Sequence, residues 1–487
     1  MMRRRLQRIP WRLPLLLALL LSCCLQRAAV AAAGSEDSSN APATTGVLSG
    51  TVGGKRTLVL LDTFTTRQTH SAFFSSLRSR GHQLTFQLAS QMEAELVSFG
   101  EYLYDNMVVF APRAKLDTKA LGVASIVDFV DSGGNLLLAG GPELSKSMRH
   151  VSALSGVEFD PSGSMVADHF SFASELEEAT APHTVVKATD VADNTFLLGS
   201  AARAGKPILF RGLAHTVADD NVLAAPVLRA PGTAYSFSAR KGAVTLHNAG
   251  ADAALVTAVQ ARNNARLVFA GSLDLFSNRF FEEPGAGNQA FCEELSKWAF
   301  AERGVLRASR VTHRRRDGSA AELLLKQKQR LDQAASLFPE PEIAKNSQVY
   351  RIKDDITYSL VLEEYDADQG GWRPYAADDV QMEFVMLDAY ERITLASDAA
   401  TGTFSTTFTA PDTYGIFKFR ILYRRVGLTV LLVSTQVSIR PYKHNEYERF
   451  IPSAYPYYAG ALSLMGGFFI FTYVFINASG SQKRKHD

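Results

Sequence analysis

The chain has 487 residues, of which 46% are hydrophobic and 21% charged, and this length suits two or three packed domains. The composition excludes disordered and fibrous proteins. Six of the 51 basic residues and none of the 49 acidic ones fall within residues 1–33, so the rest of the chain carries 45 basic against 49 acidic side chains. A mildly acidic chain offers no basic surface to a phosphate backbone, and we expect no nucleic-acid binding.

The N-terminal segment has the three parts of a secretory signal peptide over residues 1–33. Arginines precede an apolar run over 13–21, and small residues follow over 28–34. We place the cleavage site near Ala33. The next segment, 34–54, is rich in Ser, Gly, Ala and Thr, and we predict a flexible leader there.

Cysteine usage excludes an internal disulfide. Cys23 and Cys24 leave with the signal peptide, and only Cys292 remains. The folded domains must therefore depend on burial of apolar surface, which domains of this size can supply.

Residues 55–305 are predicted to form one large α/β region. Short apolar runs alternate with helical segments, as is typical of a parallel sheet covered on both faces. Gly133 and Gly134 fit a helix end, where a positive φ is needed. The predicted strands are 57–61, 83–88, 107–110, 136–139, 208–211 and 266–271, and the predicted helices are 71–80, 118–131 and 289–302.

The search for catalytic chemistry in this region is mostly negative. The sequence contains no G-x-G-x-x-G, P-loop, G-x-S-x-G, H-E-x-x-H or C-x-x-C motif. Asp62 with His70, and Asp168 beside His169, are the acid and histidine pairs that come closest to a site. We expect Asp62 to cap a turn and the adjacent pair to point apart. Cys292 falls within a predicted helix, which argues against a nucleophile. We predict no catalytic, cofactor-binding or metal-binding residue.

Residues 306–348 change in composition, and we predict a linker with a surface helix. Arg314–Arg316 precede good helix formers over 320–338, and Pro339 and Pro341 end that run. The arginines are expected to form a solvated face.

Residues 349–442 change to a period of two, with apolar residues alternating over 356–362, 380–386, 417–423 and 433–439. This pattern predicts antiparallel strands packed on one face, and hence a small β-sandwich. Asp366–Asp368 match the D-x-D pattern of metal-dependent glycosyltransferases. Because Gln369, Gly370 and Gly371 follow, we favour a hairpin turn.

A juxtamembrane stretch over 443–454 leads into 22 uncharged residues, 455–476. As a helix they span roughly 33 Å at about 1.5 Å per residue, which matches a hydrocarbon core of about 30 Å. Tyrosines mark one edge, and basic residues of the tail, 477–487, follow the other. We predict a type I membrane protein with its bulk in the lumen. The alternative is a buried core helix. The one glycosylation sequon, Asn477–Ser479, lies at the cytosolic edge and should remain unused.

Two features of this end are candidate contact sites. Ala459, Ser463 and Gly467 recur every four residues as a stripe of small side chains, which would let a second helix approach closely. The alternative is that small residues are simply common in membrane helices. Lys483 and Lys485 stand fifth and third from the carboxyl terminus, which resembles a dilysine retrieval signal. A basic cluster that sets orientation explains the same residues.

Over about 55–476 the chain resembles the family of forty-eight-kilodalton oligosaccharyltransferase subunits. It departs from the family pattern over about 314–345, where it carries an insertion. The matching segments are T-L-V-L-L-D (57–62), T-H-S (69–71), G-E-Y-L-Y-D-N (100–106), P-I-L-F-R-G (207–212), Q-A-R-N-N-A-R (260–266), G-S-L-D-L-F-S (271–277), 304–307 and Y-E-R-F-I-P-S-A-Y-P-Y-Y (447–458).

The resemblance implies a non-catalytic, organising subunit in the endoplasmic reticulum membrane. The complex transfers a preassembled glycan from dolichyl diphosphate to asparagine in N-x-S/T sequons of nascent proteins. The implied partners are a multi-span catalytic subunit, ribophorin-like subunits and other small membrane subunits, with no cofactor. The implied fold is amidotransferase-like or flavodoxin-like, without Cys at the nucleophile position. The W-W-D-Y-G signature of the catalytic subunit is absent, because Trp11, Trp298 and Trp372 are isolated.

Two other functions stay open. The α/β cleft could bind a glycan or the lipid-linked donor, which the fold permits. A free-standing lumenal hydrolase or transferase is the third possibility, and the missing nucleophile motif counts against it.

Overall fold

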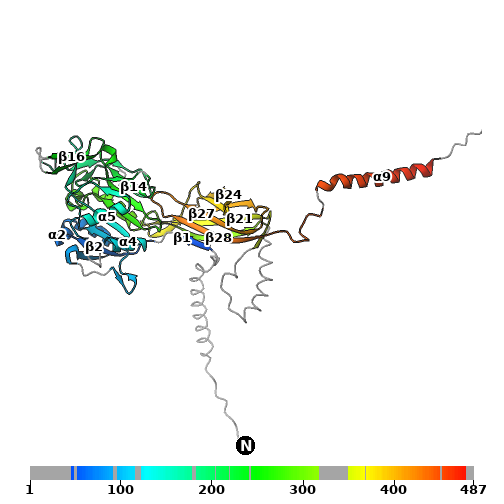
Figure 1. Cartoon of the computed structure of the whole chain (residues 1–487), viewed down its shortest axis with the longest axis horizontal. Coiled ribbons are helices and arrows are strands. Elements are labelled where there is room, and N and C mark those ends of the chain that lie inside the picture. Colours follow the sequence, from blue (N-terminus) through cyan, green and yellow to red (C-terminus); the bar gives the residue numbers. More distant parts are fainter. Residues whose placement is uncertain are drawn as a thin grey trace, which may run out of the picture.

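The computed structural model describes residues 45–48, 52–91, 96–115, 122–177, 182–202, 205–218, 220–240, 243–316, 349–367, 369–449 and 452–478. The expected signal peptide, most of the leader, most of the expected insertion, and Lys483 and Lys485 lie outside these ranges. The α/β domain, the sandwich and helix α9 (Tyr455–Asn477) follow one another in a row, as Figure 1 shows.

A mixed sheet forms the centre of the α/β domain, with strand order β11-β14-β17-β18-β7-β6-β2-β3. The part from β18 to β3 is parallel, as predicted, whereas β17, β14 and β11 are antiparallel additions. The bounds are β2 Arg56–Leu61, β3 Gln83–Leu88, β6 Asn106–Phe110, β7 Asn135–Ala139, β11 Asp190–Val191, β14 Ala224–Arg229, β17 Ala254–Gln260 and β18 Arg266–Ala270.

Helices cover both faces of this sheet. Successive residues of β2, such as Val59 and Leu60, point to opposite faces of the sheet and enter two separate apolar clusters. Both faces are therefore buried. Helices α3 and α7 pack on one face, and α4 and α5 pack on the other. Gly133 has a φ of +96° just after α4, as expected of a helix end. The bounds are α2 Phe64–Thr69, α3 Ser71–Ser79, α4 Val123–Asp131, α5 Lys146–Leu154, α6 Asn278–Phe281 and α7 Asn288–Ala299.

One predicted strand lies outside the main path. Strand β12 (Ile208–Phe210) pairs with β10 (Val186–Ala188) in a separate antiparallel ribbon. A short apolar run indicates burial but not its partner, so the sequence could not assign it. Strands β8 (Val157–Phe159) and β13 (His215–Val217) join the main sheet through β17. A third sheet contains β9 (Ser164–Ala167), β15 (Tyr235–Arg240) and β16 (Ala243–Ala249). A small hairpin joins β4 (Val97–Ser98) to β5 (Glu101–Tyr102).

The predicted β-sandwich is present, with the alternating burial that the period of two requires. The first sheet contains β1 Thr45–Leu48, β20 Val349–Arg351, β23 Gln381–Val385, β24 Ala389–Thr394, β27 Gly415–Tyr423 and β28 Leu431–Arg440. The second contains β19 Leu306–Arg315, β21 Asp355–Asp366, β22 Gly371–Pro374, β25 Ala396–Asp398 and β26 Thr403–Thr409. Asp366 pairs with Gly371 in the β21–β22 hairpin, as expected, and Asp368 lies outside the described residues.

Two expectations at the sandwich boundary were wrong. Strand β1 lies within the predicted flexible leader and pairs with β28. Strand β19 occupies the start of the predicted linker and pairs with β21 along its whole length. Of the three arginines expected on a solvated face, Arg314 and Arg316 are exposed as predicted, whereas Arg315 is buried in an ion pair with Asp354. The cause is that a buried charge with a partner has the same local pattern as an exposed one.

Glu302 links the end of the α/β domain to its first strands. It lies just beyond α7, is buried, and pairs with Lys55, Arg80 and His82 from the start of β2 and the turn between α3 and β3. Burial by itself would raise the pKa of the Glu302 carboxyl. Hydrogen bonds and charges from His82, Arg80 and Lys55 outweigh burial and lower that pKa to about 2.

We expect Glu302 to make stability depend on pH in the acid range. The carboxylate's contribution is complete above its unfolded pKa near 4.5 and is lost as the pH falls toward about 2. It amounts to on the order of 3 kcal/mol. Glu302→Gln should lower the free energy of unfolding at neutral pH and flatten its fall between about pH 5 and pH 3, measured by urea unfolding. Glu143→Gln, in an exposed pair with Arg113, is the control. An unchanged pH slope in Glu302→Gln would contradict this assignment.

Candidate functional site

The two acid and histidine pairs have structural roles. Asp62 accepts a hydrogen bond from the Arg113 backbone N–H at 3.4 Å, and burial raises the pKa of the carboxyl. His70 lies between α2 and α3, with Nε2 3.2 Å from the Leu273 carbonyl and Nδ1 2.9 Å from the Thr69 hydroxyl. A neutral ring can donate at Nε2 and accept at Nδ1, so His70 ties the chain together. Burial lowers the pKa of this imidazole.

Asp168 and His169 point apart, as expected. Asp168 accepts hydrogen bonds from the Phe170 and Ser171 backbone N–H groups at 2.8 and 3.2 Å. Its other oxygen accepts from the Thr233 hydroxyl at 2.7 Å. The His169 ring turns toward His183 and Tyr235 instead.

Cys292 is buried in α7, where burial raises the pKa of its thiol. A thiol with a raised pKa is a poor nucleophile. Among the described residues, no group of three or more His, Cys, Asp and Glu side chains is placed to hold a metal ion.

Three of the family-like segments, 69–71, 207–212 and 271–277, meet beside the carboxyl edge of the parallel strands. His70 joins the first to the third, because its Nε2 lies 3.2 Å from the Leu273 carbonyl, and Asn278, directly after the third, donates to the Ser71 hydroxyl at 2.9 Å. Ser272 donates to the Arg211 carbonyl at 2.6 Å. A cleft of about 680 Å³ lies beside them and is lined by Thr69, His70, Met165, Leu176, Glu177, Pro182, Thr184, Val185, Arg211, Asp274, Ser277, Asn278, Arg279 and Phe280.

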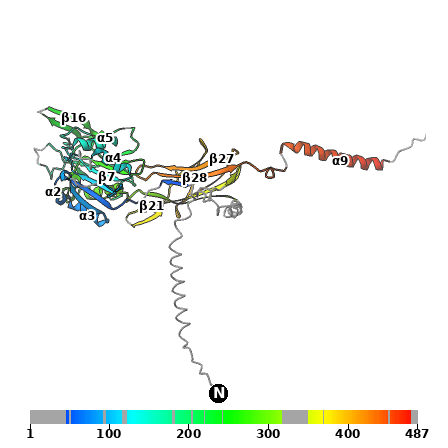
Figure 2. The same cartoon turned by 60° about the horizontal axis from the view of Figure 1, so that its bottom comes forward.

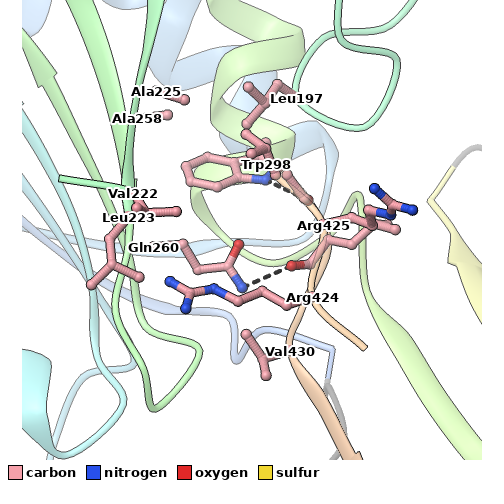
Figure 3. A pocket seen from close by; sticks show the side chains of 13 residues that line it. Leu197, Val222, Leu223, Ala225, Ala258, Gln260, Trp298, Arg424, Arg425 and Val430 are labelled. Carbon is pink, nitrogen blue, oxygen red and sulfur yellow. Dashed lines mark hydrogen bonds between the residues drawn. The ribbon is translucent and has the colours of Figure 1, made fainter. Parts of the chain in front are cut away.

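A second site lies where the loop between β27 and β28, residues 424–430, inserts against the α/β domain. Figure 3 shows this loop beside the Trp298 indole, whose N–H donates to the Gly427 carbonyl at 2.8 Å. Gln260 donates to the Leu428 carbonyl at 2.9 Å. Asn264 donates to the Val430 carbonyl at 3.1 Å and accepts from the Val430 N–H at 2.7 Å. We call this contact the joint.

Arg266 holds the α/β side of the joint. Its side chain is fully buried, and its guanidinium donates to the carbonyls of Trp298 and Gly304, each at 2.7 Å, and to that of Arg303. It also lies 5.0 Å from the Trp298 ring centre. Burial lowers the pKa of the Arg266 guanidinium to about 9, so the group stays charged at neutral pH.

The joint leaves a small, mainly apolar pocket of about 130 Å³. Leu197, Val222, Leu223 and Trp298 form its α/β side, and Val430 lies on the sandwich side (Figure 3). A pocket of this size suits one side chain rather than a glycan, so the joint is better understood as a structural contact.

The joint was not predicted from the sequence, although two family-like segments build it. Residues 260–266 and 304–307 supply Gln260, Asn264, Arg266 and Gly304. The available signal was Arg266 at the head of the apolar run 266–271, since a charge in that position needs buried partners.

Residues Ala459, Ser463 and Gly467 lie on α9. Among the described residues, only Pro452–Asn477 is a helix long and apolar enough to cross a membrane. None of the α9 side chains is buried, and in the part of the chain that the structure describes no other element lies within 4 Å of a Cβ added at Gly467. The stripe therefore remains a prediction.

Gly304→Ala should weaken the contact between the α/β domain and the sandwich more than a glycine-to-alanine change at a position away from the joint. Gly304 has a φ of +65°, and an added Cβ would lie 2.3 Å from the Gly427 carbonyl oxygen, so the loop must move. Gly370 has the same φ of +65° with no atom near its added Cβ, which makes Gly370→Ala the matched control for backbone strain of about 1–2 kcal/mol. We expect Tm to fall further for Gly304→Ala than for Gly370→Ala, and proteolysis within 424–430 to become faster for Gly304→Ala alone. Equal behaviour of the two variants would count against the joint.

Two solved structures show a partial likeness. The carbohydrate deacetylase Agd3 aligns with 51% of this chain and 33% of its own, at 10% identity and a TM-score of 0.30. A ThuA-like protein from Parabacteroides merdae aligns with 51% of this chain and 90% of its own, at 12% identity and a TM-score of 0.26.

Sequence comparison gives a clear result. Residues 49–302 match the model of the OST48 N-terminal domain, and residues 338–479 match that of the OST48 middle domain. The 48 kDa subunits of dolichyl-diphosphooligosaccharide–protein glycosyltransferase from Arabidopsis thaliana, Danio rerio and Drosophila melanogaster are 39%, 37% and 38% identical. The alignments cover 87%, 90% and 86% of this chain and 92%, 95% and 91% of those proteins. The chain therefore belongs to the family of 48 kDa subunits of dolichyl-diphosphooligosaccharide–protein glycosyltransferase.

Proposed function

We propose that this chain is a non-catalytic, organising subunit of the oligosaccharyltransferase complex. The complex transfers a preassembled glycan from dolichyl diphosphate to asparagine in N-x-S/T sequons. The observation that carries the proposal is the family match, which extends through both folded domains and α9.

The roles of the candidate catalytic groups support an organising part. His70 and Asp168 are held by hydrogen bonds that tie segments together, and Cys292 is a buried thiol with a raised pKa. Catalytic acids, bases and nucleophiles need access to substrate and a pKa suited to their task. The transfer chemistry is therefore assigned to a separate multi-span subunit.

The placement in the endoplasmic reticulum rests on α9 and on charge. The 23 residues of α9 span about 35 Å as a helix, enough to cross a bilayer. Basic residues after it favour a cytosolic tail, which would put the α/β domain and the sandwich in the lumen. Lys483 and Lys485 would then be available for retrieval.

The cleft at the carboxyl edge supports a second candidate function. It has room for sugar residues and is lined by Arg211 and Arg279, whose guanidinium groups can donate hydrogen bonds. The chain would then bind glycan or the lipid-linked donor and would still leave the transfer to its partner.

Depletion of this chain from cells should reduce glycosylation of a reporter that carries an N-x-S/T sequon. Re-expression should restore it, because the complex needs the subunit to assemble. The measurement is the gel shift of the reporter, together with identification of the proteins that co-purify through an internal tag. The purified chain alone should transfer no glycan from a dolichyl-diphosphate donor. Transfer by the isolated chain would overturn the non-catalytic role.

Gly467→Leu should release this chain from ribophorin-like and other membrane subunits in mild detergent, because the added side chain holds a neighbouring helix away. The measurement is the yield of partners that co-purify. Phe468→Leu introduces the same residue about 100° around the helix and is the control. Equal partner yields for the two variants would remove the stripe as a contact.

A further inference from the structure

The sandwich presents exposed apolar and aromatic side chains at one end. Leu387 is 90% exposed and Tyr414 is 66% exposed. The Tyr390 ring packs on Phe417, which brings the loop after β23 beside the start of β27. We call this group the end cluster, and its members are Leu387, Tyr390, Tyr414 and Ile416.

Strand register places the end cluster far from the joint. Leu431, where β28 begins, lies next to the joint, whereas Arg440 ends the strand at the opposite side. Ile416 pairs with Ser438, close to that opposite end. Figures 1 and 2 show that the chain leaves for α9 from this end of the sandwich.

A folded connection keeps this end near the start of α9. The Arg440 guanidinium makes two hydrogen bonds to Glu446, at 2.6 and 2.7 Å, and Glu446 also accepts from the Lys443 N–H at 2.8 Å. The Tyr447 ring lies 5.4 Å from that of Tyr442. The chain is therefore held to the sandwich as far as Tyr447. From there to Tyr455 are eight residues, which span at most roughly 26–29 Å when fully extended.

The chemistry of the end cluster fits a neutral lipid interface. Tyrosine is favoured where the ring is buried and the hydroxyl meets water. Leucine and isoleucine supply apolar surface that can insert beside it. Exposed charges next to the cluster along the chain are mixed: Asp388, Glu391 and Asp412 are acidic, and Arg392 and Lys418 are basic. This balance gives no strong attraction to anionic lipid, so apolar insertion is the main contribution.

We propose that the end cluster inserts into the headgroup region of the bilayer that α9 spans, so that the sandwich is seated on the membrane surface. The proposal rests on α9 crossing that bilayer. The short connection raises the effective concentration of the cluster at the interface, so a few side chains are enough to hold it there. The seated sandwich, fixed to the α/β domain by the joint, would set the height of that domain above the membrane.

Tryptophan fluorescence of the full-length chain in phosphatidylcholine vesicles tests the proposal. Leu387→Trp and Tyr414→Trp each place a reporter in the end cluster, at exposed positions where folding is not at risk. Leu246→Trp, at a 70% exposed site in β16 at the far end of the α/β domain, is the matched control (Figure 1). Spectra of the unmodified chain provide the background from Trp298 and Trp372.

The expected result is a blue-shifted emission for both cluster variants. Phosphatidylcholine brominated near the top of its acyl chains should quench them at least twofold, with no quenching of Leu246→Trp. Quenching of the cluster variants no greater than that of Leu246→Trp would overturn the proposal and leave the cluster to a protein partner. Co-purification with the other subunits is a separate measurement and tests the proposed function. Failure of the end cluster to insert is therefore distinguishable from failure of the proposed function.

Discussion

The buried guanidinium of Arg266 is the constraint on which the two-domain arrangement depends. Arg266 lies at the start of β18. Its guanidinium donates to main-chain carbonyls at the end of α7 and in the turn at Gly304, and so holds these three segments together. A buried charge is costly without hydrogen-bond partners, and these carbonyls are the partners of Nη1 and Nη2, whereas Nε has none among the described residues. The same turn delivers β19 to the sandwich and receives the loop that contains Gly427.

The joint fixes one loop of the sandwich against the α/β domain. Contacts from Trp298, Gln260 and Asn264 reach main-chain atoms of one sandwich loop, so they fix its position without depending on its side chains. A contact of this kind couples the α/β domain to β28, and β28 leads directly toward α9.

Polar side chains at the edges of the parallel strands form hydrogen bonds that hold loops in place. Asn278 and His70 tie the carboxyl edge of the parallel strands, where α/β enzymes usually place their chemistry. At the amino edge, Asn135 donates to Asn106, and Asn106 donates to the Gly54 carbonyl. Hydrogen bonds thus tie loops at both edges of the sheet, and clefts of about 680 and 430 Å³ lie beside the carboxyl and amino edges, respectively.

The sequence by itself determined the elements whose signal is local. The period of two in the sandwich, the apolar runs of β2, β6 and β7, and the uncharged stretch of α9 all agree with the structure. Tertiary structure alone decided which strands pair, because burial does not name a partner. It therefore placed β1 and β19 in the sandwich and made half of the main sheet antiparallel. The joint too could be seen only in the tertiary structure, because Arg266 is stabilised by carbonyl groups more than thirty residues away in the sequence.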